Sequence, residues 1–446
     1  MSESHADRPG PADGSARLDD LRRRIDEIDA RLISTLAERA RAVVEVGRLK
    51  RDSGAPAYIP HREQEVLARV LAANPGPLPN RTIEAIYREL MSGSFALEAA
   101  LRVGYLGPPG SFSHLAAVRQ FGSSVEFDDL HTIDEVFEAV AAGRITYGLV
   151  PYENSIGGGI TDTLDAFQQF EVRVYAETLV EITHCLLANC LPSEITRIYS
   201  KPQVFDQCRR WLQRQYPDAE LIATASSAAA VQMAAQAGEN AQTRKRANAQ
   251  MGSEEGEGRR GRDAESRAEN TSCGSAAIGS ALAGEIYGVN LIFEKIEDKP
   301  NNITRFLIIT GSAGVPPAAS RGVPSPGISR TADDAVAGEG PHAATNSGVG
   351  TLRTARSTSC KTTLMFATAD KPGALVDVLG VFRDAAINLS HIEKRPSGRV
   401  NWEYTFFIDC EGHEEEPRVR AAIDEARRHC LSLKVLGSYP RAVRVL

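Results

Sequence analysis

The stretch Val103-Gly-Tyr-Leu-Gly-Pro-Pro-Gly-Ser-Phe-Ser113 joins a short apolar run to a glycine-rich turn and then to the start of a helical pattern. Similar apolar runs recur at Tyr147–Val150 and Phe306–Ile309, and helical patterns lie between them. Short strands that alternate with helices are typical of α/β domains. We therefore predict an α/β domain over residues 102–311.

Two further polar clusters lie beside these apolar runs. Pro151-Tyr-Glu-Asn-Ser-Ile-Gly-Gly-Gly159 follows the second run, and Asn302-Ile-Thr-Arg-Phe306 opens the third. Polar residues just after a strand are where α/β proteins place ligands, and a glycine-rich turn presents N–H groups to an anion. Taken singly, each cluster also has a structural interpretation. Residues 153–155 would also suit a helix N-cap, and Thr304-Arg305 an exposed strand edge.

A long helical pattern over residues 18–51 carries cations on its apolar face. On a helical wheel, Arg39 and Lys50 fall inside the apolar stripe and Arg22 lies at its edge. Because a buried cation is costly unless it is paired, one interpretation is an anionic ligand, and the other is that both side chains snorkel to water. A second helical pattern covers residues 80–101. The stripe consists of Leu18, Leu21, Ile25, Ile28, Leu32, Leu36, Val43 and Val46.

The remaining chain divides into one folded unit and three polar stretches. Residues 361–440 follow the order β-α-β-β-α-β, with the first helix starting at Gly373 and the second at Glu416. Residues 1–16, 238–273 and 312–360 contain too few large apolar side chains to offset their ordering entropy, so we expect disorder there. The expected folded domains are thus 17–101, 102–311 and 361–446.

Composition excludes several classes of protein. The net charge of -7 argues against a nucleic-acid partner. The seven cysteines contain no CxxC pair, which indicates reduced thiols and no metal site. No apolar run reaches the roughly 18 residues of a membrane helix. We expect a cytoplasmic protein that contacts neither membrane nor nucleic acid.

The N-terminal motifs Leu21–Asp29, Leu36–Arg39, Glu45–Lys50 and Arg62-Glu63 resemble the all-helical chorismate mutase family, in which three helices per chain interlock in a dimer. The resemblance implies cations that hold the carboxylates and ether oxygen of chorismate, with Arg22 reaching into the partner's site. By this resemblance, the residues that contact chorismate are Arg22, Arg39, Lys50, Arg62, Glu63, Ser94 and Glu98.

This rearrangement needs no cofactor, because the protein has only to hold a compact dianion and stabilise charge on the ether oxygen. Many relatives carry Gln at the position of Glu98, and a carboxyl must be protonated to donate there. We therefore predict mutase activity that weakens at alkaline pH. Some relatives have Asp where this chain has Ile59, so one contact to a substrate hydroxyl differs.

The three clusters of the central domain, in this order, closely resemble prephenate dehydratase, which has two α/β lobes similar to periplasmic binding proteins with prephenate in the cleft between them. The resemblance implies Thr304 as hydroxyl donor to the leaving group and Arg305 as anchor for a carboxylate. Lys201 replaces a histidine of the family. The other expected substrate-binding residues are Ser111, Ser113, Glu153, Asn154, Ser155 and Phe306.

The C-terminal unit looks like an ACT domain, a βαββαβ module that binds amino acids at dimer interfaces. In prephenate dehydratases this module binds phenylalanine, and Lys394 stands here where Ser or Thr is usual. The alternative to phenylalanine binding is that Pro372-Gly373 only forms the turn that starts a helix and that the module serves only for dimerisation. The expected phenylalanine site comprises Gly373, Ala374, Leu375, Val376, Asn388, Glu393, Arg395 and Pro396.

Together these resemblances predict a bifunctional enzyme that converts chorismate to prephenate and then to phenylpyruvate, inhibited by phenylalanine and assembled as a homodimer or tetramer. No metal or cofactor is expected. One alternative keeps the dehydratase but makes the N-terminal helices an inactive dimerisation element. The other is a ligand-binding sensor without catalysis.

Overall fold

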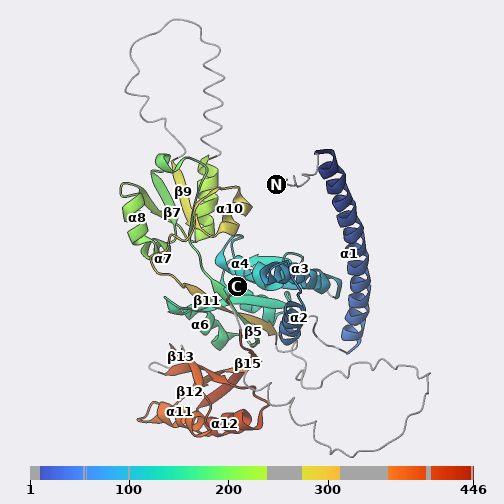
Figure 1. Cartoon of the computed structure of the whole chain (residues 1–446). Helices are drawn as coiled ribbons and strands as arrows, with labels where there is room; N and C mark the ends of the chain where they lie inside the picture. Colours follow the sequence, from blue (N-terminus) through green and yellow to red (C-terminus); the bar gives the residue numbers. More distant parts are fainter. Residues whose placement is uncertain are drawn as a thin grey trace, which may run out of the picture.

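The computed structural model describes residues 11–53, 56, 58–98, 101–238, 274–311, 360–397, 403–442 and 445–446. Residues 1–10 and nearly all of the stretches 238–273 and 312–360, for which disorder was predicted, lie outside the described residues. The described parts form a helical domain, a two-lobed α/β domain and a C-terminal α/β domain (Figure 1). The multidomain architecture predicted from the sequence is confirmed.

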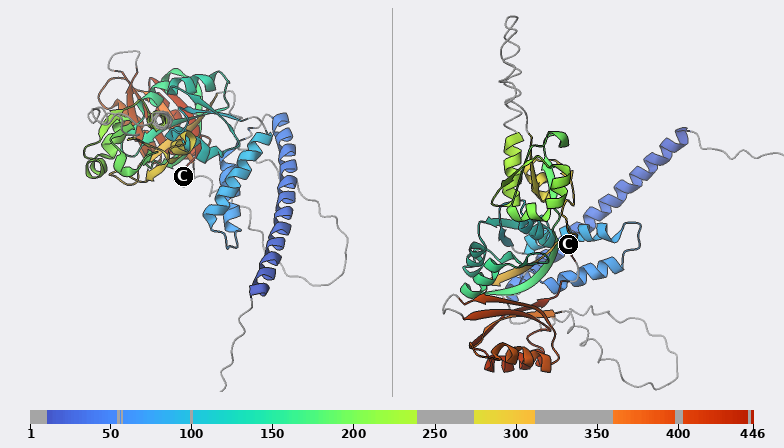
Figure 2. Two further views of the ribbon diagram at one scale, coloured as in Figure 1. Left: turned by 90° about the horizontal axis from the view of Figure 1, so that it is seen from above. Right: turned by 90° about the vertical axis from the view of Figure 1, so that its left-hand side faces the viewer.

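The N-terminal domain contains three helices: α1 (Pro11–Ser53), α2 (Pro60–Ala72) and α3 (Asn80–Glu98). Helix α1 begins at Pro11, so residues 11–16 are helical and not part of the expected tail. Its first half extends away from the rest of the chain (Figures 1 and 2). Leu18, Leu21 and Ile25 of the apolar stripe are 48%, 51% and 56% exposed. Such a long uncovered apolar face is unusual for a monomer.

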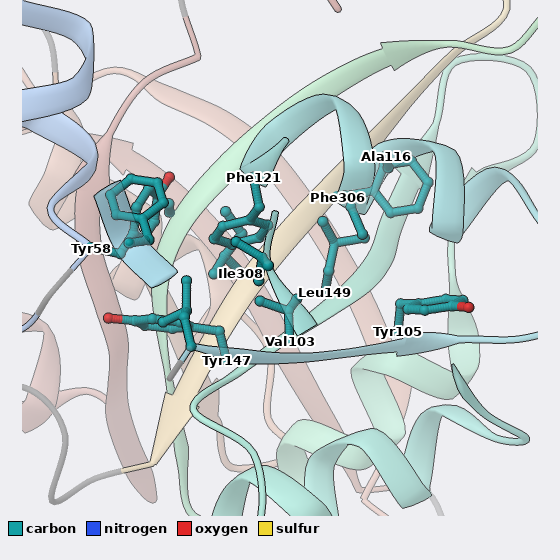
Figure 3. Packing of buried hydrophobic residues seen from close by; sticks show 14 of the residues in the cluster. Tyr58, Val103, Tyr105, Ala116, Phe121, Tyr147, Leu149, Phe306 and Ile308 are labelled. Atoms are coloured by element: carbon teal, nitrogen blue, oxygen red, sulfur yellow. The ribbon is translucent and has the colours of Figure 1, made fainter. Parts of the chain in front are cut away.

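Tyr58, between α1 and α2, joins the helical domain to the α/β domain. Its ring is 1% exposed and lies 5.5 Å from Phe95 of α3. On its other side it lies 5.0 Å from Phe121 and 5.6 Å from Tyr147 of the α/β domain. Figure 3 shows Tyr58 directed into this aromatic cluster. The two domains therefore share one hydrophobic core.

The first lobe of the α/β domain is a mixed sheet in the order β2-β1-β3-β11-β5, with the short β4 paired to β3. Strand β11 lies between β3 and β5 and is antiparallel to both, although the chain reaches it only after building the second lobe. The elements are β1 (Arg102–Leu106), α4 (Phe112–Phe121), β2 (Glu126–Leu130), α5 (Ile133–Ala141), β3 (Tyr147–Asn154), β4 (Gly158–Gly159), α6 (Thr161–Gln169), β5 (Val172–Glu181) and β11 (Ile303–Gly311).

The second lobe is a five-stranded sheet in the order β10-β6-β9-β7-β8. Residues 227–238 are also helical. The lobes contact each other directly, since Ser280 donates to the carbonyl of Gly110 and Tyr287 donates to that of Pro109. The elements are β6 (Cys185–Ala188), the 3-10 helix η1 (Pro192–Glu194), β7 (Arg197–Ser200), α7 (Pro202–Gln207), α8 (Arg209–Gln215), β8 (Glu220–Ala223), β9 (Ser275–Gly279), α10 (Ala281–Tyr287) and β10 (Leu291–Phe293).

The C-terminal domain has the predicted βαββαβ order and a four-stranded antiparallel sheet, β13-β14-β12-β15. Its helices cover one face of the sheet, and the other face packs on the first lobe, with β15 beside β5 (Figures 1 and 2). A Cβ atom at Gly437 would overlap the backbone of Val174 in β5, so only glycine permits this close packing. The elements are β12 (Cys360–Ala367), α11 (Ala374–Asp384), β13 (Leu389–Pro396), β14 (Tyr404–Glu411), α12 (Pro417–Arg428) and β15 (Ser432–Pro440).

Candidate active sites

In the helical domain, the structure brings together four of the residues expected to bind chorismate. Arg39 donates to the Ser94 hydroxyl at 2.7 Å, and Lys50 Nζ lies 2.6 Å from Glu98 Oε2. Ser94 and Glu98 are buried. The two cations on the α1 stripe therefore face polar groups of α3, which the helical wheel of α1 alone could not reveal. A Cβ atom at Gly47 would lie 2.9 Å from the Glu98 Cα, so this glycine allows the close approach.

The other three predicted residues of this domain lie elsewhere. Arg22 is exposed and pairs with Asp19, and 17 residues of helix separate it from Arg39, which corresponds to about 25 Å at 1.5 Å per residue. Arg62 is exposed and pairs with Glu65. Glu63 accepts a long hydrogen bond (3.4 Å) from Gln120 of the α/β domain. It also lines a cavity between α2 and α4. Within one chain, Arg22 cannot reach the group around Lys50.

In the α/β domain, Thr304 and Asn154 face each other on paired strands. They are register partners in β11 and β3, and Asn154 Nδ2 donates to Thr304 Oγ1 at 2.9 Å. The same amide donates to Asn302 Oδ1 at 2.7 Å. Both Thr304 and Asn302 are buried. Because Thr304 Oγ1 accepts from Asn154, its own hydrogen remains to be donated.

The orientation of the Asn154 amide is fixed by the turn that follows it. Its Oδ1 accepts from the backbone N–H groups of Ile156 and Gly157, at 3.0 and 2.8 Å. Asparagine side chains commonly bond the backbone two residues on in this way. The carbonyl end of the amide is thereby occupied, which leaves the NH₂ group to point at Thr304.

Two of the three predicted serines bond the backbone through their side chains. Ser155 Oγ donates to the carbonyl of Asn301 and accepts from Ile303 N–H. Ser111 caps α4 by accepting from His114 N–H, and it donates to the Leu106 carbonyl. Ser113 is buried in the first turn of α4. Ser111 is thus a helix N-cap, which the sequence analysis did not anticipate, whereas 153–155, for which an N-cap was the alternative, form the end of β3 and a turn.

The second lobe contributes two side chains that the sequence analysis did not single out. Gln207, at the end of α7, accepts from Asn302 at 3.5 Å and lies 2.6 Å from His184 Nε2. Burial lowers the pKa of His184. A chain of contacts therefore links His184 to Thr304 through Gln207, Asn302 and Asn154. The residues Ser200-Lys-Pro-Gln203 include Lys201, which replaces a histidine of the family, and Gln207 lies one helical turn beyond Gln203. That spacing is the signal by which the sequence could have indicated Gln207.

Arg305, expected to anchor a substrate carboxylate, points to the opposite face of the sheet from Thr304. Its Nε donates to Glu177 at 2.7 Å, its Nη1 lies 2.6 Å from Asp409 Oδ2, and its Nη2 donates to Tyr439 at 2.9 Å. Asp409 and Tyr439 belong to the C-terminal domain. Successive residues of a strand alternate between faces, which is why Thr304 and Arg305 separate. This placement does not support the expected anchoring role.

Glu153 and Phe306 also lie away from Thr304. Glu153 is half-buried and approaches His391 of the C-terminal domain at 3.4 Å, and the hydrogen bond with His391 holds its pKa below the usual value. Phe306 is buried in the aromatic cluster of the first lobe (Figure 3). Burial lowers the pKa of Arg305, but Tyr439, Asp409 and Glu177 raise it more, so the guanidinium stays charged.

The predicted phenylalanine-binding residues separate into two groups. Gly373, with a φ of +85°, precedes α11 and is followed by Ala374, Leu375 and Val376, of which Val376 is exposed. Asn388 donates to Glu411 at 3.2 Å.

The second group lies on β13, on the face that meets the first lobe. There Arg395 forms a bidentate ion pair with Asp165, Glu393 packs on Gly159, and Pro396 accepts from Gln168. Within one chain, these residues and the turn at Gly373 lie on opposite faces of the sheet.

Among the described residues, no helix has the length and apolar character needed to cross a membrane. The same part of the chain contains no group of three or more His, Cys, Asp or Glu side chains arranged to hold a metal ion.

Comparison with known proteins agrees with the three domains. Residues 21–99 match the chorismate mutase type II model, residues 103–255 and 260–313 match prephenate dehydratase, and residues 362–428 match the ACT domain.

Whole-chain relatives carry the same arrangement. A bifunctional chorismate mutase/prephenate dehydratase of Stutzerimonas stutzeri is 37% identical over 434 residues, covering 96% of this chain and 98% of the relative. That of Aquifex aeolicus is 32% identical over 431 residues, covering 96% and 98%. A crystal structure of prephenate dehydratase from Arthrobacter aurescens in complex with L-Phe is 28% identical, covers 77% of this chain and 90% of that one, and has a TM-score of 0.55. The chain therefore belongs to the family of bifunctional chorismate mutase/prephenate dehydratases.

Proposed function

We propose that the helical domain rearranges chorismate to prephenate, and that the α/β domain removes carbon dioxide and hydroxide from prephenate to give phenylpyruvate. Membership of the bifunctional family supports both activities. The single observation that carries the site assignment is the contact between Asn154 and Thr304, because it directs a buried hydroxyl to act as a donor.

In the mutase site, Arg39 and Lys50 hold the substrate dianion and Lys50 faces the ether oxygen together with Glu98. Support comes from the convergence of these side chains with Ser94 between α1 and α3. Fixed cations in a partly buried site stabilise the charge that develops on the ether oxygen. Arg62 and Glu63 complete the substrate contacts in this proposal.

The partner chain supplies Arg22 in this proposal. The separation between Arg22 and Lys50 along α1 and the exposed apolar stripe of that helix both support a homodimer. We also propose a cytoplasmic location, which the scattered cysteines support.

In the dehydratase site, the Thr304 hydroxyl donates a hydrogen bond to the hydroxyl group that leaves prephenate as hydroxide, and it keeps its own proton. Asn154, itself held by Asn302, keeps Thr304 in the required orientation. Ser111 and Ser155 shape the surrounding backbone, and Ser113 completes the polar wall. A neutral hydroxyl is a weak acid, so positioning and the formation of the aromatic ring supply most of the acceleration. No metal or cofactor is needed for this chemistry.

We propose phenylalanine as the effector of the ACT domain. Support comes from the left-handed conformation of Gly373, at which α11 begins, and from the similar Arthrobacter aurescens structure, which is a complex with L-Phe. Amino-acid binding at Gly373–Val376 and Asn388 would act on the dehydratase through the β13 residues that contact the first lobe. This is inhibition at a distance from Thr304.

The test measures phenylpyruvate from chorismate and, separately, from prephenate, with and without phenylalanine. We expect product from both substrates and suppression by phenylalanine. Thr304→Ala should reduce dehydratase kcat by more than about 100-fold, the usual loss on removing one donor in the transition state. Thr304→Ser, which keeps the hydroxyl, serves as the matched variant. Near-normal turnover by Thr304→Ala would remove Thr304 from the mechanism.

A further inference from the structure

We propose that Arg305 is a positioning residue for the dehydratase reaction and that Asp409 and Tyr439 of the ACT domain hold it in place. The inference rests on the proposed role of Thr304, which is its neighbour in β11. Thr304 faces Asn154 on one face of the sheet, and Arg305 faces the ACT domain on the other. The ACT domain thereby holds β11 in position from the face of the sheet opposite Thr304.

The guanidinium of Arg305 is fully engaged by three different strands. Glu177 comes from β5, Asp409 from β14 and Tyr439 from β15, at 2.7, 2.6 and 2.9 Å. The Arg305 side chain is 7% exposed and that of Asp409 is 0% exposed. A planar guanidinium that bonds several fixed partners has little freedom to move. Any change in its position is transmitted to the backbone of β11.

The backbone of β11 is irregular at this residue. The pairing of β11 with β3 shifts register between Arg305 and Phe306. Such β-bulges redirect neighbouring side chains and are frequent beside active sites. Because the regular ladder is interrupted here, side-chain contacts contribute more to the orientation of Thr304 than they would in an unbroken strand.

The balance of buried charges explains why Asp409 is required to hold Arg305. Lys361 lies 3.3 Å from Glu177, and Glu177 also accepts from Ala442 N–H. Glu177 is thus shared, and Asp409 supplies the second negative charge against Arg305 and Lys361. Asp409 is itself fixed by Thr363, which donates to its Oδ1 at 2.7 Å. A buried ion that loses one partner is strongly destabilised.

If Asp409 is neutralised, Glu177 still holds Nε at 2.7 Å, and the carboxylate that can attract the released Nη1 is Glu153, whose Oε2 lies 3.7 Å from it. Glu153 is the register partner of Arg305 on β3 and the neighbour of Asn154. A shift of Arg305 toward Glu153 therefore displaces the pair of residues that orients the Thr304 hydroxyl. The perturbation reaches the reacting atoms without any change inside the substrate site.

The experiment compares Asp409→Asn with Glu414→Gln in the full chain. Glu414 forms another close ion pair between these domains, with Arg173 at 2.6 Å, and this pair does not include Arg305 or Asn154. Since a misplacement of about 1 Å costs about 100-fold in rate, we expect Asp409→Asn to lower kcat for prephenate by about 10- to 100-fold. KM should stay within about twofold, because the substrate contacts remain. Glu414→Gln should change neither by more than about twofold.

Mutase turnover and the thermal unfolding curve of each variant establish that the measured protein is folded. The double variant Arg305→Gln/Asp409→Asn should lose no more than the worse single variant, since both act through one contact. If Asp409→Asn does not fold, Tyr439→Phe tests the inference in its place. Its kcat should fall at least about threefold, because it lacks the charge-assisted hydrogen bond from Arg305.

The outcomes separate this inference from the proposed function. An Asp409→Asn variant (or Tyr439→Phe in its place) that matches Glu414→Gln, while Thr304→Ala is inactive, overturns the inference and leaves the proposed function intact. An Asp409→Asn variant whose KM rises while its kcat is unchanged also overturns the inference. So does a double variant whose decrease in kcat equals the product of the two single decreases. Normal turnover by Thr304→Ala instead rejects the proposed function.

Discussion

Replacing Asn154 by aspartate exchanges the NH₂ group that faces Thr304 for an oxygen. The other oxygen still accepts from Ile156 and Gly157 N–H, so the turn after β3 is retained. The new oxygen stands 2.9 Å from Thr304 Oγ1 and 2.7 Å from Asn302 Oδ1. Thr304 then rotates its hydroxyl to donate to the carboxylate, and its hydrogen is no longer available to the substrate.

The size of the effect follows from the bond that must be broken before Thr304 can donate again. A hydrogen bond to a charged group contributes about 1.5–3 kcal/mol. Since each 1.4 kcal/mol or so corresponds to a factor of ten in rate, we expect Asn154→Asp to lower dehydratase kcat by about 10- to 150-fold. Acid conditions protonate the introduced carboxyl and make it a donor, so the kcat of the variant should recover toward wild type as pH falls.

The assay is phenylpyruvate formation from prephenate at saturating substrate, over a range of pH. Asn74→Asp is the matched control, because Asn74 also bonds the backbone two residues on and donates through Nδ2 to a second asparagine, Asn80. It lies in the loop between α2 and α3 and should leave dehydratase turnover unchanged. Turnover by Asn154→Asp within about twofold of wild type, at neutral pH, would refute the argument that Asn154 directs the Thr304 hydrogen.

Two further predictions concern other parts of the chain. Lys50→Met should lower mutase kcat by at least about 100-fold through loss of a fixed cation, measured as chorismate consumption, while turnover of added prephenate is unchanged. Glu153→Gln should lower the Tm at pH 7, and the difference should vanish as pH falls through the lowered pKa of Glu153, because the wild-type carboxyl then loses its charge and its interaction with His391. A Tm difference that persists in strong acid, or a dehydratase loss in Lys50→Met, would contradict these expectations.

The motif Thr304-Arg305-Phe306 illustrates how far sequence reasoning reaches. Its position at the start of a strand, and its association with Asn154, were predictable from the apolar runs and the family resemblance. The structure places Arg305 on the opposite face of the sheet from Thr304, because neighbours in a strand alternate between faces. Alternation alone would have separated Arg305 from Thr304. The identity of the partners of Arg305 required the docking of a domain more than 50 residues further along the chain.

The mutase helices show the complementary case. Periodicity placed Arg39 and Lys50 on the apolar stripe of α1, and the structure supplies their contacts with Ser94 and Glu98. The wheel could not show these contacts, because they depend on the packing of α3 against α1 at Gly47. The wheel also could not show that most of the stripe is exposed within one chain. Helical periodicity identifies an apolar face, but it does not identify the element that covers that face.

The place of β11 in its sheet has a consequence for synthesis of the chain. Strand β5 pairs only with β11 among the strands of its sheet, and β11 follows it by more than 100 residues. A chain that emerges from the ribosome N-terminus first must therefore hold the edges of β3 and β5 open until the whole second lobe has been made. Long-range pairing of this kind is slow and leaves strand edges exposed to aggregation. The second lobe, whose sheet needs no later strand among the described residues, is free to fold while its neighbour waits.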